Sequence, residues 1–141
     1  MRREAGLLLK GFLEEARPLA PRCIILFGSY ARGNFTEGSD IDLCVIAKNL
    51  PKDELARRSL RGLYSTRKVR ALGFYPEEFL QYLRGARFLA YDIISEGIPI
   101  YDDGFFYEAR RVYEECLRTY GIVKEAKGWR IAPHSSLRKD G

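Results

Sequence analysis

The chain has 141 residues and a formal net charge of +5, and its residues are 46% hydrophobic and 13% aromatic. This length predicts a single domain with an ordinary core, and the hydrophobic content excludes a disordered polymer. Arginine is abundant while asparagine and glutamine are scarce, a bias typical of a thermophilic source. The positive charge favours polyanionic partners such as nucleotides or nucleic acid.

The cysteines and the N-terminal residues indicate where the protein works. Cys23, Cys44 and Cys116 are widely spaced in apolar runs, which predicts buried free thiols in a reducing compartment and excludes a disulfide framework. The apolar run near the N-terminus is interrupted by Lys10 and Glu14, so it does not have the pattern of a signal peptide. No segment is long and apolar enough for a membrane span. We therefore expect a cytoplasmic protein without a membrane partner.

The first half of the chain alternates helical and extended patterns. An apolar stripe at helical spacing predicts a helix over 3–17, and a run of branched and aromatic residues predicts a strand over 22–27. A short helix is expected over 29–32. A loop over 34–39 then leads to a second strand over 40–47.

The second half continues the alternation, ends in a basic segment and contains no internal repeat. Its predicted elements are a helix over 51–64, a strand over 68–75, a helix from residue 76, a helix over 88–96, an edge strand over 98–101 and a helix over 105–120. We expect one domain over 1–121 and a loosely ordered basic tail over 122–141. The order of elements favours a small mixed sheet covered by helices.

The most informative pattern lies at the ends of the first two predicted strands. The first strand stops at Gly28-Ser29, and after ten intervening residues Asp40 and Asp42 begin the second strand. Residues i and i+2 of a strand share a face, so the two carboxylates repel each other unless a cation lies between them. Oxygen ligands at this spacing suit Mg²⁺ or Mn²⁺, and a glycine turn lets the backbone approach a phosphate. The alternative is a plain turn with two exposed aspartates, although strands disfavour aspartate.

Gly28-Ser29-Tyr30-Ala31-Arg32-Gly33, followed by Ser39-Asp40-Ile41-Asp42-Leu43, resembles the signature of the DNA polymerase β-type nucleotidyltransferases. The similarity is greatest to the minimal, single-domain prokaryotic members of this superfamily. It implies an α+β, two-layer fold in which helices pack on a small mixed sheet. It also implies an enzyme that transfers a nucleoside monophosphate, AMP from ATP, to a protein or nucleic-acid acceptor.

The resemblance assigns roles to five residues. It implies that Asp40 and Asp42 are the catalytic metal ligands for two divalent cations, Mg²⁺ or Mn²⁺, and that Gly28 and Ser29 hold the β- and γ-phosphates of the triphosphate. Arg32 has two roles open to it, a contact with phosphate or an ion pair with a nearby carboxylate.

One position departs from the family pattern. The family carries a third aspartate on the next strand, where this chain has Arg70. A guanidinium cannot ligate a metal, and Ala71, one residue on, is no ligand either. Glu77 and Glu78 lie beyond the predicted strand and are interpreted as acids of the first turn of a helix.

This departure leaves two functions open. One is an active nucleotidyltransferase that works with a single well-held metal or borrows an acid from its acceptor or partner. The other is a degenerate nucleotide-binding module that acts by docking to another protein. The resemblance implies a small HEPN-domain protein as that partner, in a toxin–antitoxin module where active members transfer AMP to a tyrosine of the toxin.

A basic cluster raises a third hypothesis. It consists of Arg57, Arg58, Arg61, Arg67, Lys68 and Arg70 and is followed by the basic tail with Trp129. The cluster predicts either a solvated helix face or a surface that binds nucleic acid through its phosphates. His134 in the tail is not expected to be a catalytic base. The predicted edge strand with Pro99 is a candidate surface for a homo-oligomer.

Overall fold

A four-stranded mixed sheet forms the centre of the protein in the computed structural model, which describes residues 3–60 and 68–132. Its strands are β1 (Pro21–Phe27), β2 (Ile41–Ala47), β3 (Val69–Phe74) and β4 (Ile98–Asp102), in the spatial order β3-β2-β1-β4. β1 pairs antiparallel with both β2 and β4, whereas β2 and β3 run parallel. The parallel pair brings the start of β3 beside the start of β2, and this register determines the site described below.

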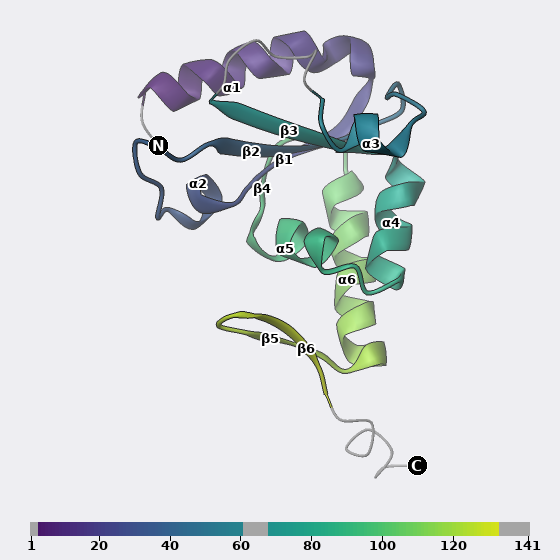
Figure 1. Cartoon of the computed structure of the whole chain (residues 1–141). Helices are drawn as coiled ribbons and strands as arrows, with labels where there is room; N and C mark the ends of the chain where they lie inside the picture. Colours follow the sequence, from purple (N-terminus) through teal and green to yellow (C-terminus); the bar gives the residue numbers. More distant parts are fainter. Residues whose placement is uncertain (1–2, 61–67, 133–141) are drawn as a thin grey trace.

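Helix α1 (Arg3–Ala16) covers one face of the sheet, and the 3-10 turn η1 (Arg17–Leu19) leads from it into β1. Figure 1 shows α1 lying along this face of the sheet. Leu9 and Phe12 of α1 pack in one core cluster with Ile24 and Leu26 of β1 and with Leu43 of β2. Because successive strand residues point to opposite faces, the alternate residues of β1 and β2 are available to the other layer.

Three helices cover the second face of the sheet: α4 (Pro76–Arg84), α5 (Phe88–Glu96) and α6 (Phe105–Tyr120). Cys23 and Ile25 of β1 and Cys44 of β2 are fully buried against them. All three cysteines are buried free thiols, as predicted, and burial raises their pKa values. The α+β fold, a small mixed sheet with helices packed on it, is therefore as predicted, and the helices cover both faces of the sheet instead of forming a two-layer arrangement.

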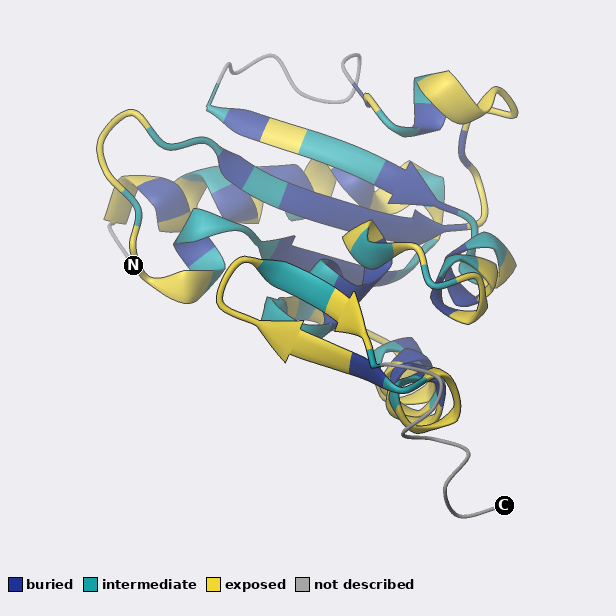
Figure 2. Ribbon diagram, turned by 60° about the horizontal axis from the view of Figure 1, so that its bottom comes forward, coloured by how far each residue is buried: buried dark blue, intermediate teal, exposed yellow. Residues whose placement is uncertain are grey.

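The segment after α6 differs from its predicted loose order. Residues 122–131 form a hairpin of β5 (Ile122–Glu125) and β6 (Gly128–Ile131), whereas 133–141 lie outside the described residues. The hairpin strands are largely exposed, in contrast to the buried β2 (Figure 2). The hairpin is held by Trp129, whose ring stacks on Phe88 with the ring centroids 6.2 Å apart and meets the Tyr91 ring edge-on at 5.4 Å. An aromatic residue in an otherwise basic segment was the signal for this docking.

The helix predicted over 51–64 is also different. It is a single turn, α3 (Glu54–Arg57), in which the Asp53 carboxylate caps the N-terminus by accepting the Ala56 N–H at 2.9 Å. The backbone N–H of Leu60 donates to Ala71 of β3, so the chain has left the helix by then. The remainder of that prediction, 61–64, lies outside the described residues. None of the helices formed by residues 3–60 and 68–132 is long and apolar enough to cross a membrane.

Candidate nucleotide site

Gly28 makes the turn between β1 and the short helix α2 (Ser29–Arg32), and its backbone conformation has φ +74°. The antiparallel register sets Phe27, the last residue of β1, opposite Asp42 of β2. A Cβ atom at Gly28 would lie 2.4 Å from Oδ2 of Asp42, closer than any real contact. Both the positive φ and the proximity of the carboxylate therefore require glycine at this position.

The acid pair lies beside this turn, at the beginning of β2. Asp40 precedes the strand and Asp42 is its second residue, and their side chains are 38% and 17% exposed. A single guanidinium reaches both carboxylates, so the structure brings the two predicted acids together. Their position as neighbours follows from the two-residue period of an extended chain.

Arg70 provides that guanidinium, because the parallel register pairs it with Asp42. Its Nε and Nη2 each lie 3.0 Å from Oδ1 of Asp42, and its Nε lies 3.4 Å from Oδ2 of Asp40. Arg70, at the position where the resemblance implied a third acid, is therefore a counter-ion of Asp40 and Asp42. Its side chain remains 68% exposed, so solvent weakens these ion pairs.

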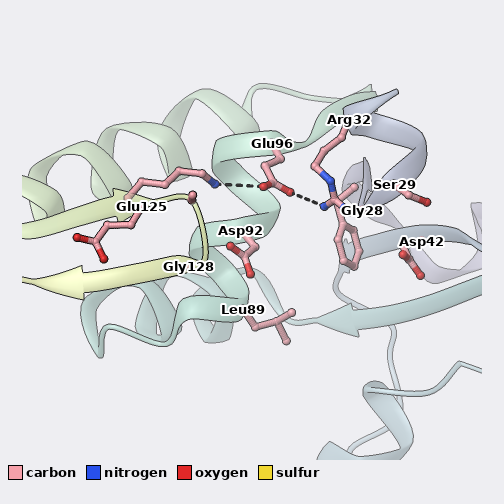
Figure 3. A pocket seen from close by; sticks show the side chains of 12 residues that line it. Gly28, Ser29, Arg32, Asp42, Leu89, Asp92, Glu96, Glu125 and Gly128 are labelled. Carbon is pink, nitrogen blue, oxygen red and sulfur yellow. Dashed lines mark hydrogen bonds and ion pairs between the residues drawn. The ribbon is translucent and has the colours of Figure 1, made fainter. Parts of the chain in front are cut away.

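A cavity of about 420 Å³ opens between the Gly28 turn, helix α5 and the β5–β6 hairpin (Figure 3). Its lining consists of Phe27, Gly28, Ser29, Arg32 and Asp42 from the sheet side, Leu89, Asp92 and Glu96 from α5, and Lys124, Glu125, Ala126 and Gly128 from the hairpin. This volume lies within the range of about 300–1,000 Å³ common for small-molecule sites. Four of the five predicted site residues line the cavity.

An ion-pair chain crosses one side of the cavity. Arg32 Nη1 donates to Glu96 Oε1 at 3.0 Å, and Lys124 Nζ donates to Glu96 Oε2 at 3.1 Å (Figure 3). Burial alone would raise the pKa of the Glu96 carboxyl, but the two cations outweigh burial and hold this pKa below its ordinary value. Of the two predicted roles of Arg32, the structure contains the ion pair with a carboxylate. Sequence reasoning missed Glu96 and Lys124, and no local pattern distinguishes them from surface charges.

The donor set fits one hard divalent cation. Asp40 and Asp42 offer carboxylate oxygens beside a cavity, and Mg²⁺ commonly binds one or two carboxylates together with substrate phosphates and water. Within residues 3–60 and 68–132, no group of three or more acidic, histidine or cysteine residues is placed to hold a metal. The described residues therefore suit a single cation and lack the third carboxylate that a second cation would use.

Two residues of the basic cluster are structural. The Arg57 guanidinium, 9% exposed at its side chain, donates to both carboxylate oxygens of Glu78 at 3.0 and 2.7 Å. Arg58 donates to Glu78 Oε2 at 2.6 Å and to the Gly73 carbonyl at 2.7 Å. The prediction that these two arginines form a solvated face or a nucleic-acid surface is wrong, because Glu78 binds both. Glu78 is a first-turn acid of α4, as predicted, and also accepts the Tyr75 N–H.

The mixed sheet, the glycine turn and the adjacent acid pair define the nucleotidyltransferase class of fold. Residues 9–104 match the family model described as Polymerase beta, Nucleotidyltransferase, and the chain belongs to this family. The hairpin that forms one wall of the cavity lies outside the matched residues.

Known proteins resemble parts of the chain. Two provisionally named protein adenylyltransferases of Methanocaldococcus jannaschii are 65% identical over 37 residues and 54% identical over 28 residues. The first stretch covers 26% of this chain and 25% of that relative, and the second covers 20% and 28%. The chain thus matches about a quarter of the length of each relative. A crystal structure of a toxin–antitoxin with AMP-PNP has the same fold, with a TM-score of 0.51 and 22% identity over 79% of this chain and 86% of that one.

Proposed function

We propose that the protein transfers AMP from ATP to a hydroxyl group of a protein acceptor, with one Mg²⁺ or Mn²⁺ bound by Asp40 and Asp42. One observation carries this proposal: Gly28 adopts a positive φ with its backbone against the Asp42 carboxylate, at the mouth of a nucleotide-sized cavity. A turn of this kind lets the backbone approach phosphate oxygens beside the acid that holds their counter-ion.

In this proposal each residue has a separate task. The backbone at Gly28 and Ser29 receives the β- and γ-phosphates, while Asp40 and Asp42 supply oxygen ligands. A bound divalent cation would neutralise phosphate charge in the substrate and in the departing pyrophosphate. Arg32, held by Glu96, lies on the cavity wall as a charged donor for phosphate. The acceptor oxygen forms a bond to the α-phosphorus while the bond to the bridging oxygen breaks, and the hydroxyl proton passes to solvent.

A protein acceptor is favoured over nucleic acid. Arg57 and Arg58, two members of the basic cluster behind the nucleic-acid hypothesis, are bound to Glu78 with side chains only 9% and 18% exposed, so they are unavailable for phosphates. The relatives named as protein adenylyltransferases also support a protein acceptor. A HEPN-domain partner that offers a tyrosine remains our preferred candidate, and the fold shared with a toxin–antitoxin crystal structure is compatible with it.

A second function rests on Arg70. Because its guanidinium pairs with both acids, the site can also belong to a nucleotide-binding module that docks to its partner without turnover. The two functions share the proposed nucleotide site but differ in whether AMP is transferred from ATP to an acceptor.

The test is incubation of the full chain with ATP labelled at the α-phosphate, Mg²⁺ and candidate acceptor proteins or RNA. We expect label on a protein, with transfer lowered at least about 100-fold in Asp42→Asn, since loss of an essential metal ligand removes several kcal/mol of transition-state stabilisation. Glu115→Gln, an exposed carboxylate of α6, is the matched control and should transfer normally. ATP binding without transfer to any acceptor would favour the second function, and transfer that survives Asp42→Asn would contradict the first.

A further inference from the structure

The cavity has two chemically different ends. At one end are the Gly28 turn and Asp42, where the proposed function puts the phosphates. At the other end α5 contributes the carboxylate of Asp92 and the apolar side chain of Leu89 (Figure 3). The hairpin adds Ala126 to the lining, while the Glu125 carboxylate is paired with Arg130. Carboxylates repel a polyphosphate but accept hydrogen bonds from hydroxyl and amino groups. The hairpin end is therefore suited to the uncharged part of a nucleotide.

Asp92 is held in place for this task by the hairpin. Its Oδ1 accepts the indole N–H of Trp129 at 2.7 Å, and Trp129 is packed against Phe88 and Tyr91. In the part of the chain that the structure describes, the other carboxylate oxygen of Asp92 has no hydrogen-bonding partner. A side chain fixed through one oxygen and lining a cavity is pre-organised to accept a ligand's donor with the other.

Lys124 provides a second attachment between the hairpin and α5, in addition to the hydrogen bond from Trp129 to Asp92. Its ammonium group donates to Ser95 Oγ at 3.2 Å and to Glu96 at 3.1 Å, both at the end of α5, and lies 4.7 Å from the centroid of the Trp129 ring. Two independent attachments thus join β5 and β6 to the helix that carries Asp92. The wall is a built part of the cavity, although residues 122–131 lie beyond the family-matched segment.

We propose that the β5–β6 hairpin and α5 form the nucleoside subsite of this protein. In this subsite Asp92 accepts a hydrogen bond from a sugar hydroxyl or a base amino group, and Leu89 and Ala126 contact the base. This inference rests on the proposed nucleotide site and adds to it the residues that distinguish a nucleoside triphosphate from a bare polyphosphate. Asp92 and Leu89 lie within the family-matched residues 9–104, whereas Ala126 and the Trp129 indole that holds Asp92 lie beyond them. The C-terminal hairpin therefore completes a subsite that begins on α5 of the family domain.

The test compares the affinities for ATP and for inorganic tripolyphosphate, each with Mg²⁺, by calorimetry on the full chain. Asp92→Asn keeps an oxygen for the Trp129 indole but replaces the other oxygen with a donor. We expect ATP to bind about tenfold more weakly, because a hydrogen bond to a charged acceptor is lost. Affinity for tripolyphosphate should change less than about twofold, since that ligand has no nucleoside donor. Glu115→Gln on α6 should leave both affinities unchanged.

The outcomes separate this inference from the proposed function. If wild type binds ATP, and Asp92→Asn weakens both ligands equally or neither, the nucleoside subsite is overturned while the nucleotide site stands. If wild type binds neither ligand in the presence of Mg²⁺, the nucleotide site itself is refuted, together with the subsite. Emission from Trp129, the single tryptophan of the chain, provides a second readout: ATP should perturb it and tripolyphosphate should not.

Discussion

Replacing Arg70 with alanine should strengthen metal binding. The Arg70 guanidinium pairs with the carboxylates of Asp40 and Asp42, so a cation that binds both carboxylates must displace it. Exposed ion pairs contribute about 0.2–1 kcal/mol each, so breaking two pairs makes the free energy of metal binding less favourable by up to roughly 2 kcal/mol. At 1.4 kcal/mol per tenfold change, Arg70→Ala should bind Mn²⁺ about 2- to 30-fold more tightly than wild type.

The assay is a Mn²⁺ titration without nucleotide, followed by electron paramagnetic resonance of the free ion. Arg111→Ala removes an exposed arginine of α6 and controls for the change in net charge, so it should bind Mn²⁺ as wild type does. The double variant Arg70→Ala, Asp42→Asn should lose the gain in Mn²⁺ affinity that Arg70→Ala produces alone. An Arg70→Ala affinity equal to or weaker than that of wild type would refute the competition.

Three further predictions concern the turn, a buried ion-pair cluster and the hairpin. Gly28→Ala should abolish ATP binding and lower the free energy of unfolding by about 1–3 kcal/mol, because the new Cβ collides with Asp42 at a positive φ. Calorimetry measures the binding and urea unfolding the stability, and Gly38→Ala, whose Cβ would have no atom within 4 Å, is the control. Glu78→Gln should lower the free energy of unfolding by roughly 2–3 kcal/mol, as measured with urea at pH 7. This is somewhat below the ~3–5 kcal/mol lost when a fully buried ion pair is broken, because the Glu78 side chain is 15% exposed. Trp129→Ala should lower the free energy of unfolding by about 2 kcal/mol and weaken ATP binding, as followed by circular dichroism and calorimetry; wild-type values for both would show that the hairpin wall is dispensable.

The Glu78 cluster also sets a pH dependence. Burial alone would raise the pKa of Glu78, but hydrogen bonds from Arg57 and Arg58 outweigh it and lower the pKa below the ordinary 4.5. A carboxyl with a lowered folded-state pKa stabilises the protein fully above the ordinary value and loses that contribution as pH falls through the lowered one. Wild type should therefore lose stability on acidification below about pH 4.5, and Glu78→Gln should lose less over the same range. Equal losses in both proteins would rule out Glu78 as the source.

Local patterns were sufficient for most of the elements. Short runs of branched and aromatic residues identified β1 and β2, and an apolar stripe at helical spacing identified α1. The helix predicted over 51–64 was too long because its continuation depended on scattered leucines. Pairing of Leu60 with Ala71 of β3 ended the helix instead, and this is a tertiary contact. Arg57 and Arg58 were misjudged for a related reason, since their partner Glu78 is twenty or more residues away.

The sequence by itself determined the acid pair of the candidate site. Asp40 and Asp42 could be paired from spacing alone, because the two-residue period of an extended chain defines which side chains share a face. Only the tertiary structure decided the remainder. The antiparallel register of β1 and β2 brought Gly28 beside Asp42. The parallel register of β2 and β3 set Arg70 on the acid pair, and docking of Trp129 brought Lys124 to Glu96, 28 residues away. Contacts between distant segments depend on how whole elements pack, and no local pattern encodes that packing.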